Sequence, residues 1–256
     1  GSARATVTRL REELGVTLGY DIEPVRSIPR ARNRALSLAK GNYVAIIDDD
    51  EFPPPDWLIT MYRAIQTFDV DGVLGPVYPF FDESPPKWLI KGRFCERPVY
   101  RTGTLLTWDQ TRTGNVLLKK SVFEDHGLCF DRSFETGGSD REFFRQAMEM
   151  GYRFVAVEEA PVYEVVTKER WEKIYWLNRA IVNGFNSQRY HADGPVLARL
   201  PGILRSLVLL MAYGIIIPFA PIGGTHTIMK YAEKGAHHLS RLAGAMGVQL
   251  IKTRDF

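Results

Sequence analysis

The sequence has 256 residues, of which 45% are hydrophobic and 25% are charged, a composition typical of an ordinary folded protein. A net charge of only +3 argues against a nucleic-acid-binding protein, and two cysteines are too few for a disulfide framework.

The chain begins with patterns of two helices and then a buried strand. Residues 4–14 predict a helix, and residues 16–25 predict a short extended segment. Apolar residues at helical spacing, with a proline directly ahead of them, predict a second helix over residues 30–40. The apolar run 43–47 predicts a buried parallel strand, and it ends abruptly in the acidic residues 48–51.

Strand and helix patterns continue to alternate along the chain. In order, they are a helix over 55–68, strands over 71–77 and 115–119, a helix over 140–150, a strand over 152–157 and a helical stretch over 170–190. Residues 79–113 are rich in proline, glycine and tryptophan and predict an excursion from the sheet. The alternation predicts an α/β fold with a mainly parallel sheet flanked by helices.

The C-terminal region predicts a separate helical unit, residues 201–256, that follows a domain at 1–200. Its apolar run from Leu207 to Ile222 is 16 residues long and contains Pro218 and Pro221. A spanning helix needs ~20 apolar residues, so an interfacial or re-entrant hairpin is expected. An amphipathic basic helix that follows would suit an anionic membrane surface. The alternative is a helical pair packed on the domain or on a second subunit.

The run Asp48-Asp49-Asp50 is the most informative motif. Adjacent carboxylates repel one another unless something positive lies beside them. Ligands also bind at the carboxyl ends of parallel strands, so a divalent ion that bridges carboxylates and a diphosphate would satisfy both conditions. The alternative is a solvated acidic turn ahead of the next helix.

Three further motifs each have a structural and a functional interpretation. In the segment 136–142, Gly138 allows close approach of the backbone, and Asp140 is either a helix cap or a general base. Arg30 lies at a helix start, which suits a diphosphate site or simply a solvated basic helix. Gly114 and Asn115 enter a predicted strand and alone indicate only a turn.

Taken together and in order, these stretches resemble family 2 glycosyltransferases of the GT-A fold, and most of all the succinoglycan-type exopolysaccharide branch. The matching stretches are RARNRAL at 30–36, GNYVAIIDDDEFPPPDWL at 41–58, TGNVLLKK at 113–120, TGGSDREFF at 136–144 and GYRFVAVEEAPVYE at 151–164. The resemblance covers roughly residues 15–190.

The resemblance implies a role for each matching position. Asp50, with Asp48, would bind Mn²⁺ or Mg²⁺, and Glu164 stands where relatives place a metal-proximal group. Asp140 would be the general base on the acceptor hydroxyl.

Other matching positions would contact the substrates. The residues assigned to the nucleotide and donor sugar are Arg30, Asn33, Asp48, Asp49, Gly114, Asn115 and Gly138. Those assigned to the acceptor are Trp88, Trp108 and Arg141, although each tryptophan is also a candidate core residue.

The chain departs from the family pattern at three places. Ser139 stands where relatives commonly have glutamate before the base. The Gln-x-x-Arg-Trp motif of processive polymerases is absent, since residues 186–190 (NSQRY) do not fit it, and a single-addition enzyme is favoured. Nothing in residues 1–25 matches the family's first strands and base-binding aspartate, so an N-terminally incomplete GT-A domain is expected.

The resemblance thus implies an inverting, metal-dependent transfer of a sugar from a nucleotide-sugar, expected to be a UDP-sugar, to a saccharide acceptor, expected to be lipid-linked. The expected place is the cytoplasmic face of the bacterial inner membrane. One rival is a catalytically inactive membrane-associated scaffold of the same fold. Another is a metal-dependent phosphohydrolase, which would need histidine or aspartate ligands beyond these motifs.

Overall fold

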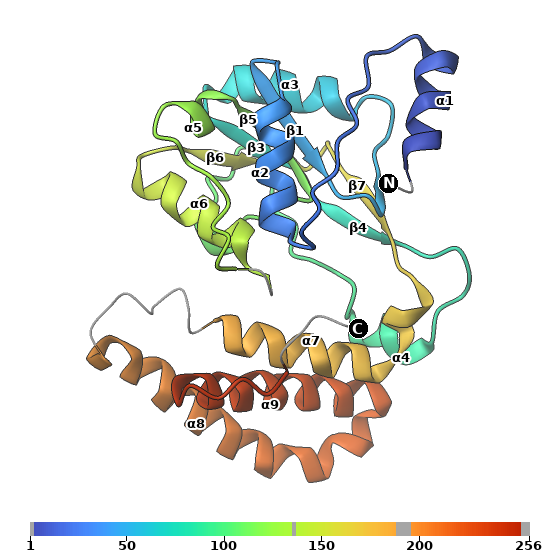
Figure 1. The fold of residues 1–256 in the computed structure, drawn as a ribbon. Coiled ribbons are helices and arrows are strands. Elements are labelled where there is room, and N and C mark those ends of the chain that lie inside the picture. Colours follow the sequence, from blue (N-terminus) through green and yellow to red (C-terminus); the bar gives the residue numbers. More distant parts are fainter. Residues whose placement is uncertain (1–2, 135–136, 188–195, 252–256) are drawn as a thin grey trace.

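The computed structural model describes residues 3–134, 137–187 and 196–251. Helix α1 (Arg4–Leu14) forms where the sequence predicts it, and residues 16–25 contain no strand in the described chain. Helix α2 (Ile28–Leu38) follows and has Pro29 in its first turn, where the missing N–H is of no consequence. Figure 1 shows α1 standing apart from the sheet and α2 lying beside it.

The main sheet has the strand order β1-β5-β3-β6. Its strands are β1 (Tyr43–Ile47), β5 (Asn115–Lys119), β3 (Gly72–Leu74) and β6 (Phe154–Ala156). β5 is antiparallel to both of its neighbours, whereas β3 and β6 are parallel. The α/β class is confirmed, but the sheet is mixed rather than mainly parallel in its pairing, because the one reversed strand lies in the middle.

A second, smaller sheet has the order β2-β7-β4. Its strands are β2 (Glu51–Phe52), β7 (Val162–Val165) and β4 (Val77–Phe80). The single strand predicted over 71–77 is therefore two strands, divided at Gly75-Pro76. A side chain at position 75 would have its Cβ 1.9 Å from the carbonyl oxygen of Ala160, so only glycine allows this close crossing.

Both faces of the main sheet are covered. In β5, Val116 and Leu118 pack into one core and Leu117 into the other, as the alternation of side chains in a strand requires. Helix α3 (Trp57–Phe68) covers the second face, and α6 (Ser139–Glu149) covers the first. Short helices α4 (Lys87–Gly92), α5 (Ser121–Glu124), η1 (Trp108–Gln110) and η2 (Lys168–Trp171) lie in the connections.

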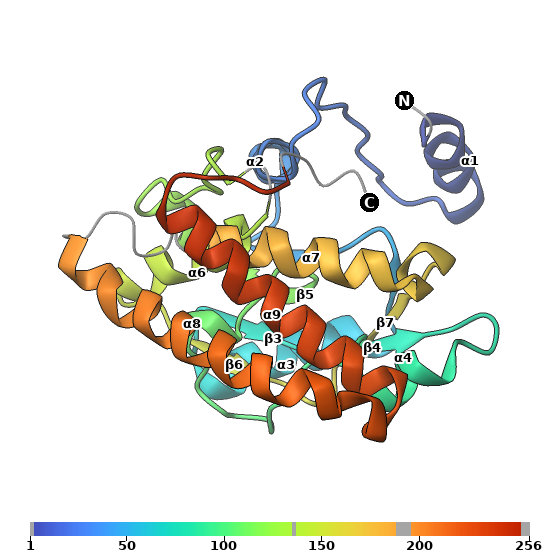
Figure 2. The same ribbon diagram turned by 90° about the horizontal axis from the view of Figure 1, so that it is seen from below.

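The C-terminal part is a layer of three long helices below the sheets, as Figures 1 and 2 show. Its helices are α7 (Lys173–Asn186), α8 (Val196–Ile216) and α9 (Thr225–Ala245), with η4 (Ile217–Gly223) between the last two. The two prolines expected to break the apolar helix both lie in η4, which separates α8 from α9. α9 packs against α7, where a Cβ at Gly184 would lie 2.1 Å from the carbonyl oxygen of His237.

Candidate functional site

The acidic residues after β1 form a tight turn. The N–H of Glu51 donates to the carbonyl of Asp48 at 3.1 Å, and the carboxylate of Glu51 accepts from the N–H of Asp48, also at 3.1 Å. Gly114 lies directly against this turn, because a Cβ there would meet Glu51 Oε1 at 2.7 Å and Asp48 Oδ2 at 3.2 Å. Glycine at 114 thus leaves room for the carboxylates of Glu51 and Asp48, which a larger residue would displace.

Glu51 is a site residue that sequence reasoning did not single out. Its Oε1 is buried without a hydrogen-bond partner among the described residues. Burial raises the pKa of Glu51 to about 7, although its hydrogen bond from the Asp48 N–H opposes the shift. Its position could have indicated this role, because Glu51 directly follows the three aspartates in the sequence.

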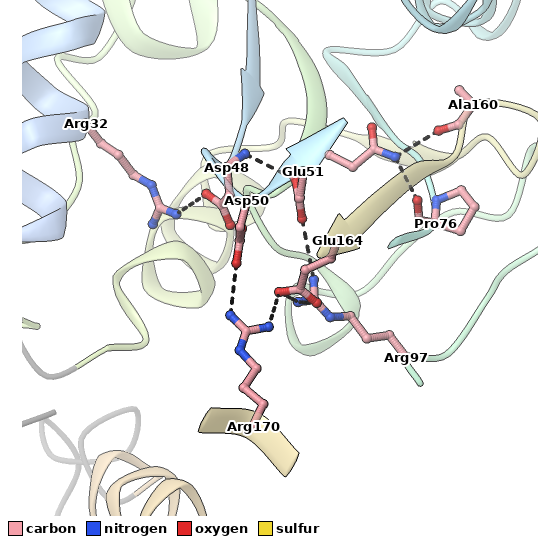
Figure 3. A network of polar contacts seen from close by, with 10 residues as sticks. Arg32, Asp48, Asp50, Glu51, Pro76, Arg97, Ala160, Glu164 and Arg170 are labelled. Carbon is pink, nitrogen blue, oxygen red and sulfur yellow. Dashed lines mark hydrogen bonds and ion pairs between the residues drawn. The ribbon is translucent and has the colours of Figure 1, made fainter. Parts of the chain in front are cut away.

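Arginines surround the carboxylates, as Figure 3 shows. Arg32 lies 3.3 Å from Asp48, and Arg170 lies 3.0 Å from Asp50. Glu164, which is the cross-strand neighbour of Glu51, binds Arg97 at 2.7 Å and Arg170 at 2.8 Å. The condition set by the sequence, a positive group beside the three aspartates, is therefore met by arginine side chains in this structure.

The pKa values of Asp50 and Glu164 are shifted in opposite directions. Burial and the nearby charge of Glu164 raise the pKa of Asp50, and Arg170 only partly offsets them. Burial also acts to raise the pKa of Glu164, but the charges of Arg97 and Arg170 outweigh it and lower that pKa. Glu164 is thus an ionised carboxylate neutralised by two arginines, while Asp50 remains in an environment with excess negative charge.

A preformed metal centre is not assembled: no three His, Cys, Asp or Glu side chains converge on one point in the part of the chain that the structure describes. The donor chemistry nevertheless fits a hard divalent cation, because Asp48 and Asp50 offer carboxylate oxygens beside Glu51. Asp49 is exposed next to them. Oε1 of Glu51 accepts no hydrogen bond within the described residues and lies 3.9 Å from Arg97.

Asp140 lies in the first turn of α6. Gly138, with φ of 93°, is the N-cap residue, and no side chain caps this helix start. Asp140 is therefore not the cap that the alternative interpretation required. Its carboxylate makes no hydrogen bond or ion pair within the described residues, and the next residue, Arg141, is exposed. The start of this motif, residue 136, lies outside the described chain, as do residues 188–190 of the NSQRY segment.

Two residues that the sequence assigned to the nucleotide-sugar donor, Asn115 and Asn33, join separate segments of the chain by hydrogen bonds. The fully buried Asn115 accepts from Trp57 Nε1 at 2.8 Å and donates to the carbonyls of Pro76 and Ala160. Asn33 exchanges two hydrogen bonds of 2.8 Å with the backbone of Phe130. Arg30 differs from both, because its buried Nε has no partner among the described residues.

The two tryptophans proposed for the acceptor are partly buried. Trp88 packs edge-on against Phe94, in a cluster that includes Trp176 of α7 and Met229 of α9. Trp108 packs against the main core beneath α6. Both positions agree with the core interpretation of these residues, and each ring keeps some exposed surface.

Arg97, Arg112 and Arg170 complete the site and were not found from the sequence. Arg97 and Arg112 lie in the excursion 79–113, and Arg170 is the first residue of the predicted helical stretch 170–190, so no motif marked them. Burial and then the charges of Arg97 and Arg141 lower the pKa of Arg112 to about 10, while Asp140 opposes the shift. The loop of Arg112 runs beside the helix of Asp140, because η1, which ends two residues before Arg112, packs against α6.

Comparisons with known proteins show which family and fold the chain is similar to. The profile of the family described as "Glycosyl transferase family 2" matches residues 24–130. The succinoglycan biosynthesis protein ExoM of Rhizobium meliloti (strain 1021) is 31% identical over 194 residues, which are 75% of this chain and 62% of that protein. A glucosyl-dolichyl phosphate glucuronosyltransferase of Haloferax volcanii is 26% identical over 162 residues, which are 62% of this chain and 47% of that protein.

The chain thus spans less than two thirds of the length of these relatives. Among solved structures, S. aureus TarS 1-349 in complex with UDP-GlcNAc aligns with a TM-score of 0.50 and 12% identity. The alignment covers 97% of this chain and 80% of that chain, a likeness that concerns the fold.

Proposed function

Because the match over residues 24–130 and the similarity to ExoM show that the chain belongs to glycosyl transferase family 2, we propose that it transfers a sugar from a UDP-sugar to a saccharide in exopolysaccharide or cell-surface glycan synthesis. The GT-A fold expected from the sequence is confirmed. One observation carries the proposal. An acidic turn at a strand end lies among arginines, and the carboxylate of Asp140 makes no hydrogen bond or ion pair within the described residues.

The proposed chemistry divides between the two ends of this site. Asp140 takes the proton from the acceptor hydroxyl as that oxygen attacks the anomeric carbon, which inverts the configuration. Arg30 and Arg32, on the first turns of α2, bind the diphosphate, for which a helix N-terminus and a guanidinium are both suited. Asp48 and Asp49 contact the nucleotide side of the donor.

Mn²⁺ or Mg²⁺ is the proposed cofactor. Asp50 and Asp48 would hold the ion, and Glu51 and Glu164 would support the carboxylates around it. When bound, the ion neutralises the negative charge that grows on the leaving diphosphate. The raised pKa of Asp50, caused by burial and by Glu164, indicates a place where a cation would be stabilising.

A donor screen tests the proposed function. The purified chain is titrated calorimetrically with UDP and GDP in the presence of Mn²⁺, and a panel of UDP- and GDP-sugars is then offered with saccharide acceptors. We expect UDP to bind and one UDP-sugar to be used, one sugar per acceptor. Binding without any transfer would favour the inactive scaffold, and release of inorganic phosphate from the nucleotide would favour the phosphohydrolase.

The outer face of α8 supports the proposed location at the cytoplasmic face of the inner membrane. Residues 200–223 are long and apolar enough to cross a membrane by length and composition, and 11% of their most apolar window is buried inside the protein. Exposed side chains form a stripe at helical spacing: Leu200, Leu204, Val208, Met211, Ile215, Phe219 and Ile222. The turn at η4 returns the chain to α9, so we propose that this stripe lies on the bilayer rather than crossing it.

Introducing two glutamates into the stripe should weaken the binding of the protein to lipid vesicles. We expect the Met211→Glu, Ile215→Glu variant to lose at least about tenfold in partitioning to vesicles that contain anionic lipid, because each side chain would otherwise bury ~1.5–3 kcal/mol of apolar surface. Flotation of the full chain with vesicles measures the effect. Salt should weaken the wild-type binding without abolishing it, since screening acts only on the charges.

The control for this experiment is Leu58→Glu, Ile59→Glu, which places the same charges on two exposed apolar residues of α3. It should float as well as the wild type. A wild-type chain that does not float, or two double variants that behave alike, would show that the stripe contacts something other than a membrane.

A further inference from the structure

Arg112 is a partly buried cation that forms no ion pair with the described residues. It lies in the loop before β5, between Thr111 and Thr113, which are 2% and 1% exposed. Its guanidinium makes no hydrogen bond or ion pair to any residue in the described ranges, unlike Arg32, Arg97 and Arg170. A charge withdrawn from water without a partner is unfavourable, so this arginine is suited to an anion that the described residues do not supply.

The surroundings of Arg112 are positive. Arg97 and Arg141 are close enough for their charges to lower its pKa, to about 10, in addition to the effect of burial. Arg97 is already neutralised by Glu164, with both carboxylate oxygens 2.7 Å from the guanidinium. Arg141 is exposed and has no ion pair in the described part of the chain. The loop of Arg112 lies beside α6, which carries Asp140 and Arg141, because η1 packs against that helix.

This cluster differs from the arginines around the aspartate turn. Arg32 and Arg170 contact Asp48 and Asp50, where the donor diphosphate is proposed to bind. The acidic group that acts on Arg112 is instead Asp140, the proposed base for the acceptor hydroxyl. An anion held by Arg112 and Arg141 would therefore lie on the acceptor side of the site.

We propose that Arg112 and Arg141 bind an anionic group, the carboxylate of a uronic acid or a phosphate ester, carried by the acceptor saccharide beside the hydroxyl that Asp140 deprotonates. A guanidinium matches either group with two parallel hydrogen bonds. This inference rests on the proposed sugar transfer, because it names the class of acceptor for the same site.

Simple glycosides test the inference without knowledge of the natural acceptor. Methyl β-glucuronoside, methyl β-glucoside and glucose 6-phosphate are titrated into the full chain by NMR, with and without UDP and Mn²⁺. We expect at least one of the two anionic sugars to bind about tenfold more tightly than the neutral glucoside. Arg112→Gln should remove this preference and leave UDP affinity unchanged, and Arg141→Gln should reduce it. Arg63→Gln, the same charge loss at an exposed residue of α3, should keep it.

Each other outcome overturns the inference. If the wild type binds UDP but does not prefer either anionic sugar, the inference fails and the proposed function stands. If Arg112→Gln weakens UDP itself, the arginine serves the diphosphate. If UDP-glucuronic acid binds more tightly than UDP-glucose and the free anionic sugars do not differ from the glucoside, the anion is on the donor. Thermal unfolding shows whether Arg112→Gln is folded; if it is not, retention of the full preference in the surface variant Arg141→Gln overturns the inference.

Discussion

Replacing Asp140 with asparagine is expected to lower the rate of sugar transfer by about 10² to 10⁴-fold, because an amide cannot accept the acceptor's proton. UDP affinity should not change, since the aspartate turn is on the other side of the site. The substitution should also leave the protein folded. Asp140 makes no hydrogen bond within the described residues, and a charge near a helix N-terminus contributes only ~0.3–1 kcal/mol.

Single-turnover rates and UDP calorimetry on the same preparation measure both quantities. Glu149→Gln is the matched control, because it removes a carboxylate from the other end of α6. Transfer by Asp140→Asn at a rate near that of the wild type would exclude Asp140 as the general base. Loss of UDP binding in this variant would place Asp140 on the donor side instead.

Replacing Asp50 with asparagine is expected to abolish the effect of Mn²⁺ on UDP binding. Removing a carboxylate ligand should lower metal affinity by at least about 100-fold, since even supporting residues of metal sites commonly contribute 10–100-fold. Arg170 would keep its bond of 2.8 Å to Glu164, so the variant leaves no buried guanidinium without a partner.

The measurement is UDP affinity by calorimetry with and without Mn²⁺. Asp56→Asn, at an exposed residue just before α3, is the control and should respond to Mn²⁺ as the wild type does. The assignment of Asp50 to the metal site would be wrong if Mn²⁺ did not change the UDP affinity of the wild type. It would also be wrong if Mn²⁺ still raised the UDP affinity of Asp50→Asn.

The positions of strands were predictable from the sequence, and their directions were not. Strands form at 43–47 and 115–119, where apolar residues predict them. β5 is buried, but the expectation of a buried parallel strand at 43–47 was wrong, because β1 is an edge strand that pairs antiparallel and buries only Val44. Alternating or continuous apolar residues report which faces of a strand are covered, and this does not depend on the direction of its neighbours. The reversed β5 follows from the path of residues 75–114, which lacks periodicity, so the mixed sheet could not be predicted.

The site was predictable where consecutive residues carry the signal. The aspartate turn and Asp140 each belong to a short motif at an element boundary. The arginines do not, because their partners are far away along the chain: Arg97 is 67 residues from Glu164, and Arg170 is 120 residues from Asp50. Asn115 was assigned to the donor, and only the fold reveals that its amide joins the carbonyls of Pro76 and Ala160.

The helices below the sheets determine how high the reaction centre would stand above a lipid surface. α9 packs against α7, and α8 packs against α9. Helix α6, which carries Asp140, lies above this layer in Figure 1. Packed helices are 8–10 Å apart, so roughly 20 Å of protein would separate the reaction centre from the outer stripe. If the protein rests on that stripe, only membrane-anchored glycans long enough to reach this height would be acceptors. Shorter anchored glycans would not reach the site.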